Sequence, residues 1–412
     1  MINNFLYIDP GTGSMLFTVI LGAATTILFL LREVYIKLRV MLSGGKALTD
    51  TKNYKKFVIF GEDERYWNVF KPILEEFEKR QIEVTFFVAN ENDPSFKESY
   101  KYVNIEVIGT GNKAYAKLNL LNAGFVLMTT PGLEVYQLKR SKKVKHYSHI
   151  FHSCSDTMGY RLFSLDYFDS ILMSGDFQGE YIRILEKIRD LPAKDLITVG
   201  CPYLDTLKEK YDAIPEEKNH QFTVLLSPSW GKSAILSLYG ESLIDPLVES
   251  GFKIIIRPHP QSKISEKDML DRLHSKYDNC KNIEWDTNRE NIYSIKKADI
   301  MISDFSAIVY DYIFLRDKPL IYATSDFDMD PYDGADIPDD VDIWQFSTLE
   351  KIGIKLNKED FKNIKEIIQN ASDSPELANA RKIAKEQAWQ HINEAGKRTV
   401  DYMISIMENK NN

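Results

Sequence analysis

The first half of the chain alternates short apolar runs with longer segments in which apolar residues recur every three or four positions. The short runs are typical of buried strands and the longer ones of amphipathic helices. Strands are expected at 57–60, 82–89, 105–109, 125–130, 146–153, 168–175 and 196–200, the last of them followed by the segment 201–211. Helices are expected at 65–80, 113–123 and 179–190. Regular alternation of strands and helices is typical of a parallel sheet covered by helices. The pattern therefore predicts an α/β fold.

A second series with the same rhythm follows a polar stretch without periodicity at 212–221, which we interpret as a linker. Strands are expected at 222–227, 252–257, 282–285, 299–303 and 319–323, and helices at 237–250, 265–276, 290–298 and 306–315. We predict two tandem Rossmann-like domains, 54–212 and 220–408. Their ligand crevices should face each other, because such sheets bind ligands at the carboxyl ends of their strands.

The N-terminal segment breaks this pattern, because Ser14–Leu31 has no charged residue. Eighteen uncharged, mostly apolar residues are near the lower limit for crossing a bilayer. Lysines and arginines follow the run and do not precede it, which favours an uncleaved anchor with the body of the protein in the cytoplasm. We therefore expect residues 1–50 to form a single-pass membrane anchor and a juxtamembrane helix. An interfacial helix or a buried core helix are the alternatives.

Composition narrows the class of protein. With 44% hydrophobic and 27% charged residues, the chain resembles a globular protein. The net charge of −8 and the lack of a basic stretch argue against nucleic acid as a partner. Cys154, Cys201 and Cys280 have neither zinc-ligand spacing nor a disulfide pattern, which suits a reducing compartment. We expect a body at the cytoplasmic face of the cell membrane.

Two strand ends in the second domain offer groups that suit a phosphate. The apolar run 254–256 leads into Arg257, Pro258, His259 and Pro260, whose restricted backbone would hold a cation and an imidazole in place. A solvent-facing turn is the alternative for this motif. The run 299–303 leads through Ser303, Asp304 and Ser306 into a predicted helix. Its first turn could bind phosphate, although serine and aspartate are equally common as helix caps.

Three histidines recur at every third position in the predicted strand 146–153. On a helix, His146, His149 and His152 would share a face and resemble metal ligands. On a strand, His149 would point away from the other two, so we expect no metal site. His152 ends the strand and is the best candidate for a general base, with a core or surface histidine as the alternative.

A fourth candidate site follows the first strand of the second domain. Trp230 could stack on a base, and Ser229 and Lys232 could meet a phosphate, or Trp230 could only close the domain interface. The acidic run 326–340 is expected to be a solvated loop, with a divalent cation site as the alternative. The sequence contains no P-loop, dinucleotide-binding glycine motif, nucleophile elbow or zinc-hydrolase helix.

Taken together, these motifs resemble the CDP-glycerol glycerophosphotransferase family of teichoic acid and capsule synthesis. The resemblance rests on Ser227–Trp230, Arg257–Pro260, Ala298–Ser306 and Asp317–Pro319. The resemblance implies a GT-B type fold, with 54–212 on the acceptor side and the nucleotide-donor site mainly in 220–408. It also implies no cofactor or metal, and one essential histidine from each domain. His259 matches the second of these histidines. The first usually lies in a tryptophan-histidine-glycine motif, and this chain has Phe151-His152-Ser153 in its place.

The expected reaction follows from this resemblance. A hydroxyl of a lipid-linked glycan or polyol-phosphate acceptor, deprotonated by His152, would attack the β-phosphorus of CDP-glycerol or a related CDP-polyol and release CMP. His259, Arg257 and the serines at the helix start would balance the charge on the phosphoryl oxygens. The alternatives are a nucleotide-sugar glycosyltransferase or epimerase of the same fold, and a non-catalytic membrane scaffold of an envelope-polymer complex.

Overall fold

The computed structural model describes residues 53–217, 221–323, 327–371 and 374–409. Residues 1–54 and 55–412 are two separate units, and both sheets belong to the second of them. The expected anchor at 1–50, including Ser14–Leu31, lies outside the described residues. No helix within the described ranges combines the length and apolar character needed to cross a membrane.

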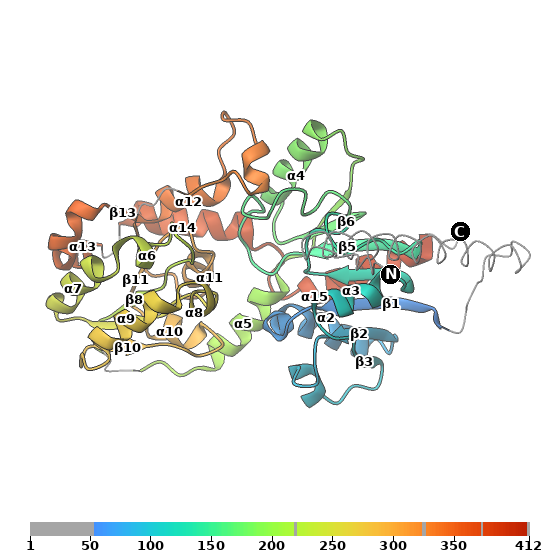
Figure 1. The fold of residues 1–412 in the computed structure, drawn as a ribbon, viewed down its shortest axis with the longest axis horizontal. Coiled ribbons are helices and arrows are strands. Elements are labelled where there is room, and N and C mark those ends of the chain that lie inside the picture. The colour runs from blue at the N-terminus through green and yellow to red at the C-terminus, as the bar shows by residue number, and fades with distance from the viewer. Residues whose placement is uncertain (1–52, 218–220, 324–326, 372–373, 410–412) are drawn as a thin grey trace, which may run out of the picture. The chain divides into compact units, whose positions relative to one another are not determined.

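The first sheet is a seven-stranded, wholly parallel sheet with the order β3-β2-β1-β4-β5-β6-β7. Figure 1 labels β1, β2, β3, β5 and β6 of this sheet. Its strands are β1 (Lys55–Gly61), β2 (Val84–Val88), β3 (Val103–Val107), β4 (Asn122–Met128), β5 (Lys143–Ile150), β6 (Ser170–Met173) and β7 (Asp195–Thr198). The helices in the same part of the chain are α2 (Trp67–Lys79), α3 (Gly111–Leu118), α4 (Phe177–Ile188) and α5 (Pro202–Ala213). The central strands are apolar and buried on both faces, as parallel sheets require.

The second sheet has six parallel strands in the order β10-β9-β8-β11-β12-β13. Its strands are β8 (Thr223–Leu226), β9 (Lys253–Ile256), β10 (Ile283–Trp285), β11 (Ile300–Ser303), β12 (Leu320–Ala323) and β13 (Ile354–Leu356). The helices from Ile235 to Ile352 are α6 (Ile235–Tyr239), α7 (Glu241–Ser250), α8 (Ser262–Ser265), α9 (Lys267–Tyr277), α10 (Ile292–Lys297), α11 (Ile308–Leu315) and α12 (Trp344–Ile352). Both sheets have the Rossmann strand order, so the α/β prediction of two parallel sheets is confirmed.

The end of the chain returns to the first sheet. After α13 (Ile364–Asn370) and α14 (Pro375–Ala388), the last helix α15 (Ala395–Asn409) packs against α2, and Val400, Met403 and Met407 join the core beneath β1 and β4. Gly175 lets the end of α14 pass close to the loop after β6, because a Cβ at this position would lie 2.0 Å from the Gln387 carbonyl oxygen. The sequence boundary of 220–408 assigned this helix to the second domain, whereas its apolar face packs with the first.

Strand order places the site. In each sheet the chain reverses its direction of winding beside the first strand, between β1 and β4 and between β8 and β11. Helices that start on opposite faces leave a crevice at such a switch point, at the carboxyl ends of the strands. The loops that follow β1, β5, β8, β9 and β11 contain most of the candidate site residues.

Candidate functional site

A cavity of about 690 Å³ is lined by loops that follow strands of both sheets. His152 comes from the loop after β5 of the first sheet, and His259 from the loop after β9 of the second. Cavities of this size at strand ends commonly hold a nucleotide-sized ligand. The two histidines that the sequence analysis selected therefore line one cavity, as that analysis expected.

His259 is held by its own loop. Its Nδ1 accepts a hydrogen bond of 3.1 Å from the backbone N–H of Gln261, so in the neutral ring the proton is assigned to Nε2. The Trp230 ring lies 6.2 Å away, centroid to centroid, and the two planes are tilted by 30°. Burial, and then the positive charge of Arg65, lower the pKa of His259 to about 4. The ring is therefore neutral at pH 7 and offers an N–H donor.

His152 lies just past the end of β5, among aromatic rings. Its Nδ1 is 3.4 Å from the Tyr160 hydroxyl, at the long end of hydrogen-bond range, and its ring meets Tyr66 edge-on. The same hydroxyl lies 3.4 Å from His149 Nε2. Burial and the charge of Arg65 lower the pKa of His152 to about 4.

The predicted strand that contains the three histidines extends too far toward the C-terminus. β5 ends at Ile150, so the alternation of side chains does not extend to His152. His149 and His152 both contact Tyr160, whereas His146 faces Ser170 and stacks on Phe125. Within the described ranges, no three histidine, cysteine or acidic side chains gather as metal ligands.

The loop after β11 differs from the expectation of direct phosphate contacts. Ser303 and Asp304 are fully buried and do not line the cavity, while Ser306 does. Ser303 Oγ donates to the Ser227 carbonyl, and Asp304 accepts from the backbone N–H groups of Ser229, Ile235 and Ser306. Burial raises the pKa of Asp304 to about 6. The two residues lie behind the cavity wall and hold the loops that line it.

The loop after β8 faces the cavity with Ser229, Trp230 and Lys232. Asp304 fixes its backbone through Ser229. Trp230 remains 43% exposed, which leaves its face available to a ligand. Arg257 also lines the cavity, but its guanidinium is buried and donates to Asp286 at 2.6 Å, so much of its charge is already paired.

Two cavity features were missed from the sequence. Arg65 lies in the short 3₁₀ helix Glu64–Tyr66 after β1, where half of its side chain is exposed, and it lowers the pKa of both histidines. The sequence feature that could have identified Arg65 is its position just after the first strand of a Rossmann-like fold. Tyr203, Asn291 and Asp311 also line the cavity and are hydrogen-bonded together. No local pattern relates these three, because they are far apart in the sequence.

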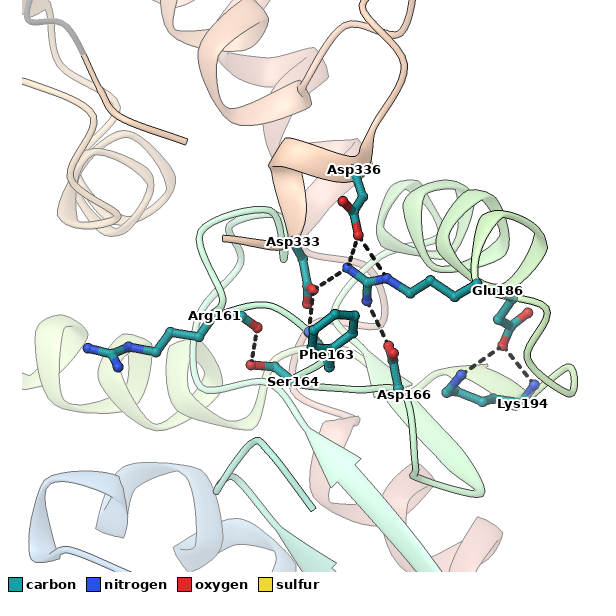
Figure 2. Close-up of polar contacts among 9 residues, drawn as sticks. Arg161, Phe163, Ser164, Asp166, Glu186, Lys194, Asp333 and Asp336 are labelled. Atoms are coloured by element: carbon teal, nitrogen blue, oxygen red, sulfur yellow. Dashed lines mark hydrogen bonds and ion pairs between the residues drawn. The ribbon is translucent and has the colours of Figure 1, made fainter. Parts of the chain in front are cut away.

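Part of the acidic run 326–340 is buried and ion-paired, whereas a solvated loop was expected. Arg189, just after α4, forms ion pairs with Asp333, Asp336 and Asp166, and Asp333 is only 1% exposed. Figure 2 shows these three carboxylates around one guanidinium group. Asp333 also accepts the backbone N–H of Phe163 at 2.8 Å. Residues 331–336 of this run thus pack onto the loops of the first sheet, whereas Asp328, Asp330, Asp339 and Asp340 are exposed. Asp328, Pro331 and Tyr332, which belong to the same run, line the cavity.

Comparison with known families gives one match. The model of the family described as CDP-glycerol:poly(glycerophosphate) glycerophosphotransferase matches residues 56–394. No curated protein matches the sequence.

Comparison with solved structures agrees with the fold. A structure of the wall teichoic acid polymerase TagF has a TM-score of 0.54 and 13% identity, with 95% of this chain and 98% of that chain covered. A putative UDP-N-acetylglucosamine 2-epimerase from Listeria monocytogenes has a TM-score of 0.55 and 11% identity, with 86% and 97% covered. At these identities the likeness concerns the fold of two facing Rossmann-like domains.

Proposed function

The chain belongs to the CDP-glycerol:poly(glycerophosphate) glycerophosphotransferase family, and we propose that it transfers glycerol phosphate, or a related polyol phosphate, from a CDP-activated donor. The acceptor in this proposal is a hydroxyl of a membrane-linked cell-envelope polymer precursor, and the product is CMP. One observation supports the proposal most strongly, namely that a histidine from each sheet lines one cavity of about 690 Å³. The fold shared with a teichoic acid polymerase is consistent with an envelope acceptor.

His152 can act as a base in one arrangement of protons. If His152 Nδ1–H donates to the Tyr160 oxygen, the Tyr160 O–H can donate to His149 Nε2. His152 Nε2 then keeps a lone pair that can accept the proton of an acceptor hydroxyl. The opposite arrangement would put the proton on Nε2 and remove this function. Tyr160 is therefore the group that orients the proposed base.

His259 and the nearby donors would stabilise the phosphoryl group. The Nε2–H of neutral His259 can donate to a phosphoryl oxygen, as can the hydroxyls of Ser229 and Ser306. Lys232 and Arg65 add positive charge at the cavity wall. Stabilising charge on the equatorial oxygens is most of what phosphoryl transfer requires of a protein. Bound phosphate would also offset the Arg65 charge and raise the pKa of both histidines.

The first experiment measures CMP release from CDP-glycerol by the purified protein with a polyol-phosphate acceptor. His259→Ala should lower kcat by about 10²- to 10⁴-fold, the usual contribution of a positioned proton donor or acceptor. His274→Ala is the matched control, because His274 is a partly exposed histidine of α9 whose Nδ1 contacts Asp278 and which does not line this cavity. Undiminished turnover by His259→Ala would remove the central residue of the scheme.

Two further arms test the remaining parts of the proposal. Turnover in EDTA tests the expectation that no metal is required, and full dependence on a divalent cation would refute it. Thermal-shift titration compares CMP with UDP and UDP-sugars, since only a ligand that binds the folded state raises the melting temperature. Stabilisation by UDP-sugars alone would favour a glycosyltransferase or epimerase, and no stabilisation by any nucleotide would favour a scaffold.

The location of the protein is tested separately. We propose that the body acts at the cytoplasmic face of the cell membrane, and this rests on the apolar segment Ser14–Leu31. Fractionation of cells expressing the full chain and a chain that begins at residue 53 should separate a membrane-bound from a released form. Equal recovery of both in the membrane fraction would refute the anchor.

A further inference from the structure

A buried carboxyl group lies in the cavity wall without a basic partner of its own. Asp311 belongs to α11 of the second sheet, and only two protein donors reach its carboxylate among the described residues. They are the Tyr203 hydroxyl, from α5, at 3.1 Å, and the Asn291 side-chain N–H, from the residue before α10, at 2.7 Å. We call these three residues the Asp311 cluster. All three line the cavity.

Two oxygens of the cluster accept no hydrogen bond from a described residue. Both donors reach the same oxygen, Oδ2 of Asp311, and among the described residues no hydrogen bond to Oδ1 is found. The Asn291 side-chain N–H donates to Asp311, and Asn291 Oδ1 is buried with no hydrogen-bond partner in the described part of the chain. Unpaired buried acceptors are uncommon in native proteins because each one costs stability. Asn291 Oδ1 is such an acceptor, and it lies beside an Asp311 oxygen in the cavity wall that has no protein donor among the described residues, which indicates that a ligand supplies the missing donors.

The charge around the cluster restricts the kind of ligand. A carboxylate would repel a phosphate oxygen but accept a hydrogen bond from a hydroxyl. Burial raises the pKa of Asp311 to about 7, and the nearby charge of Arg257 opposes that rise. Arg257, which also lines the cavity although Asp286 pairs much of its charge, thus lies near a hydroxyl-accepting carboxyl group. This pairing suits a molecule in which hydroxyls sit a few bonds from a phosphate.

We propose that the Asp311 cluster is a hydroxyl-recognition subsite, in which Asp311 accepts a hydrogen bond from a hydroxyl of the phosphorylated substrate. This inference rests on the proposed function, because it takes the substrate to be a CDP-polyol. Two parts of such a donor have hydroxyls near phosphate, the ribose and the polyol. They present the same chemistry to the cluster, and ligand analogues distinguish them.

The test compares ligands that differ by one hydroxyl, using isothermal titration calorimetry on the full chain. CMP against 2′-deoxy-CMP and 3′-deoxy-CMP tests the ribose, and CDP-glycerol against CDP-propanediol tests the polyol. In the wild-type protein one of these comparisons should show about ten- to a hundredfold weaker binding of the deoxy ligand, as expected for a lost hydrogen bond to a charged group. Asp311→Asn should reduce that ratio to within about threefold.

Two more variants separate recognition from a loss of folding. Asp311→Glu keeps the charge but moves the carboxylate by one methylene group, and it should also lose the discrimination. Asp156→Asn is the control, because Asp156 is an equally buried carboxyl group that is held by backbone N–H groups and does not line the cavity. It should keep the wild-type ratio, even if its melting temperature falls.

The outcomes are distinct from those of the proposed function. Equal affinity for both members of every pair in the wild type overturns the subsite, and so does an unchanged ratio in both Asp311 variants. Failure to release CMP from CDP-glycerol overturns the proposed function instead. Discrimination between CMP and its deoxy forms that disappears in Asp311→Asn would support the subsite even then.

Discussion

Replacing Arg65 by glutamine tests how the cavity controls its two histidines. Among the described residues, Arg65 is the positive charge that lowers the pKa of both His152 and His259. It follows a strand of the first sheet, whereas His259 follows a strand of the second. Glutamine keeps the length of the side chain and removes the charge. Because a neighbouring cation disfavours protonation, both pKa values should rise in the Arg65→Gln variant.

The size of the effect follows from the causes of each shift. The pKa of His152, about 4, lies about 2.5 pH units below the ordinary 6.5, and burial is the larger of its two causes. The Arg65 charge therefore accounts for at most about half, so the pKa of His152 should rise to no more than about 5.2. The pKa of His259 should also rise, while burial and the charge of Arg257 continue to hold it below its ordinary value.

The measurement is a pH titration of the histidine ring carbons by NMR in a protein labelled at histidine. His152→Asn and His259→Asn assign the two signals. At about 1 M salt the wild-type and Arg65→Gln curves should converge, because the exposed guanidinium is screened while burial is not. Adding CMP to the wild type should move both pKa values upward, in the same direction as the mutation.

Arg289→Gln is the control for this experiment. Arg289 is also partly exposed and lines the same cavity, but its charge is not among the causes of either shift. It should leave both titration curves in place. Unchanged curves in Arg65→Gln, or equal shifts in both variants, would refute the reasoning that Arg65 sets the protonation of this pair.

Three further predictions concern the groups around the cavity. Tyr160→Phe should lower kcat by roughly ten- to a hundredfold with little change in KM for the CDP donor, because the proposed base loses the group that orients it, and an unchanged kcat would argue against that role. Asp286→Asn should lower the free energy of unfolding in urea by about 3–5 kcal/mol, because it leaves Arg257 buried without its partner, and a loss below about 1 kcal/mol would contradict the ion pair. Arg189→Met should lower the free energy of unfolding by about 3–5 kcal/mol at pH 8. The folded-state pKa of Asp333 is about 6, above its ordinary 3.8, so protonation favours the folded state and the loss should shrink below pH 6, whereas a pH-independent loss would contradict this assignment.

Local pattern was enough to predict the two series of strands and the loops where chemistry would gather. Apolar runs such as 254–256 are buried wherever they pair, and residues that follow parallel strands meet at one edge of the sheet. His259, Arg257 and Trp230 could therefore be placed at the cavity from the sequence. The same reasoning could not tell Ser306, which lines the cavity, from Asp304, which lies behind it. Serine and aspartate suit a helix cap and a phosphate site equally well.

The alternation of polar and apolar residues by itself determined the α/β class, the order of elements and the strand ends that bear the histidines, because burial acts on each segment separately. Only the tertiary structure decided that Arg65 acts on both histidines, that α15 joins the first core, and that Arg189 binds Asp333 across 144 residues of sequence. The tertiary structure also brings together the three separate segments that form the Asp311 cluster. Such contacts depend on where loops and sheets meet in space, and periodicity along the chain holds no information about that.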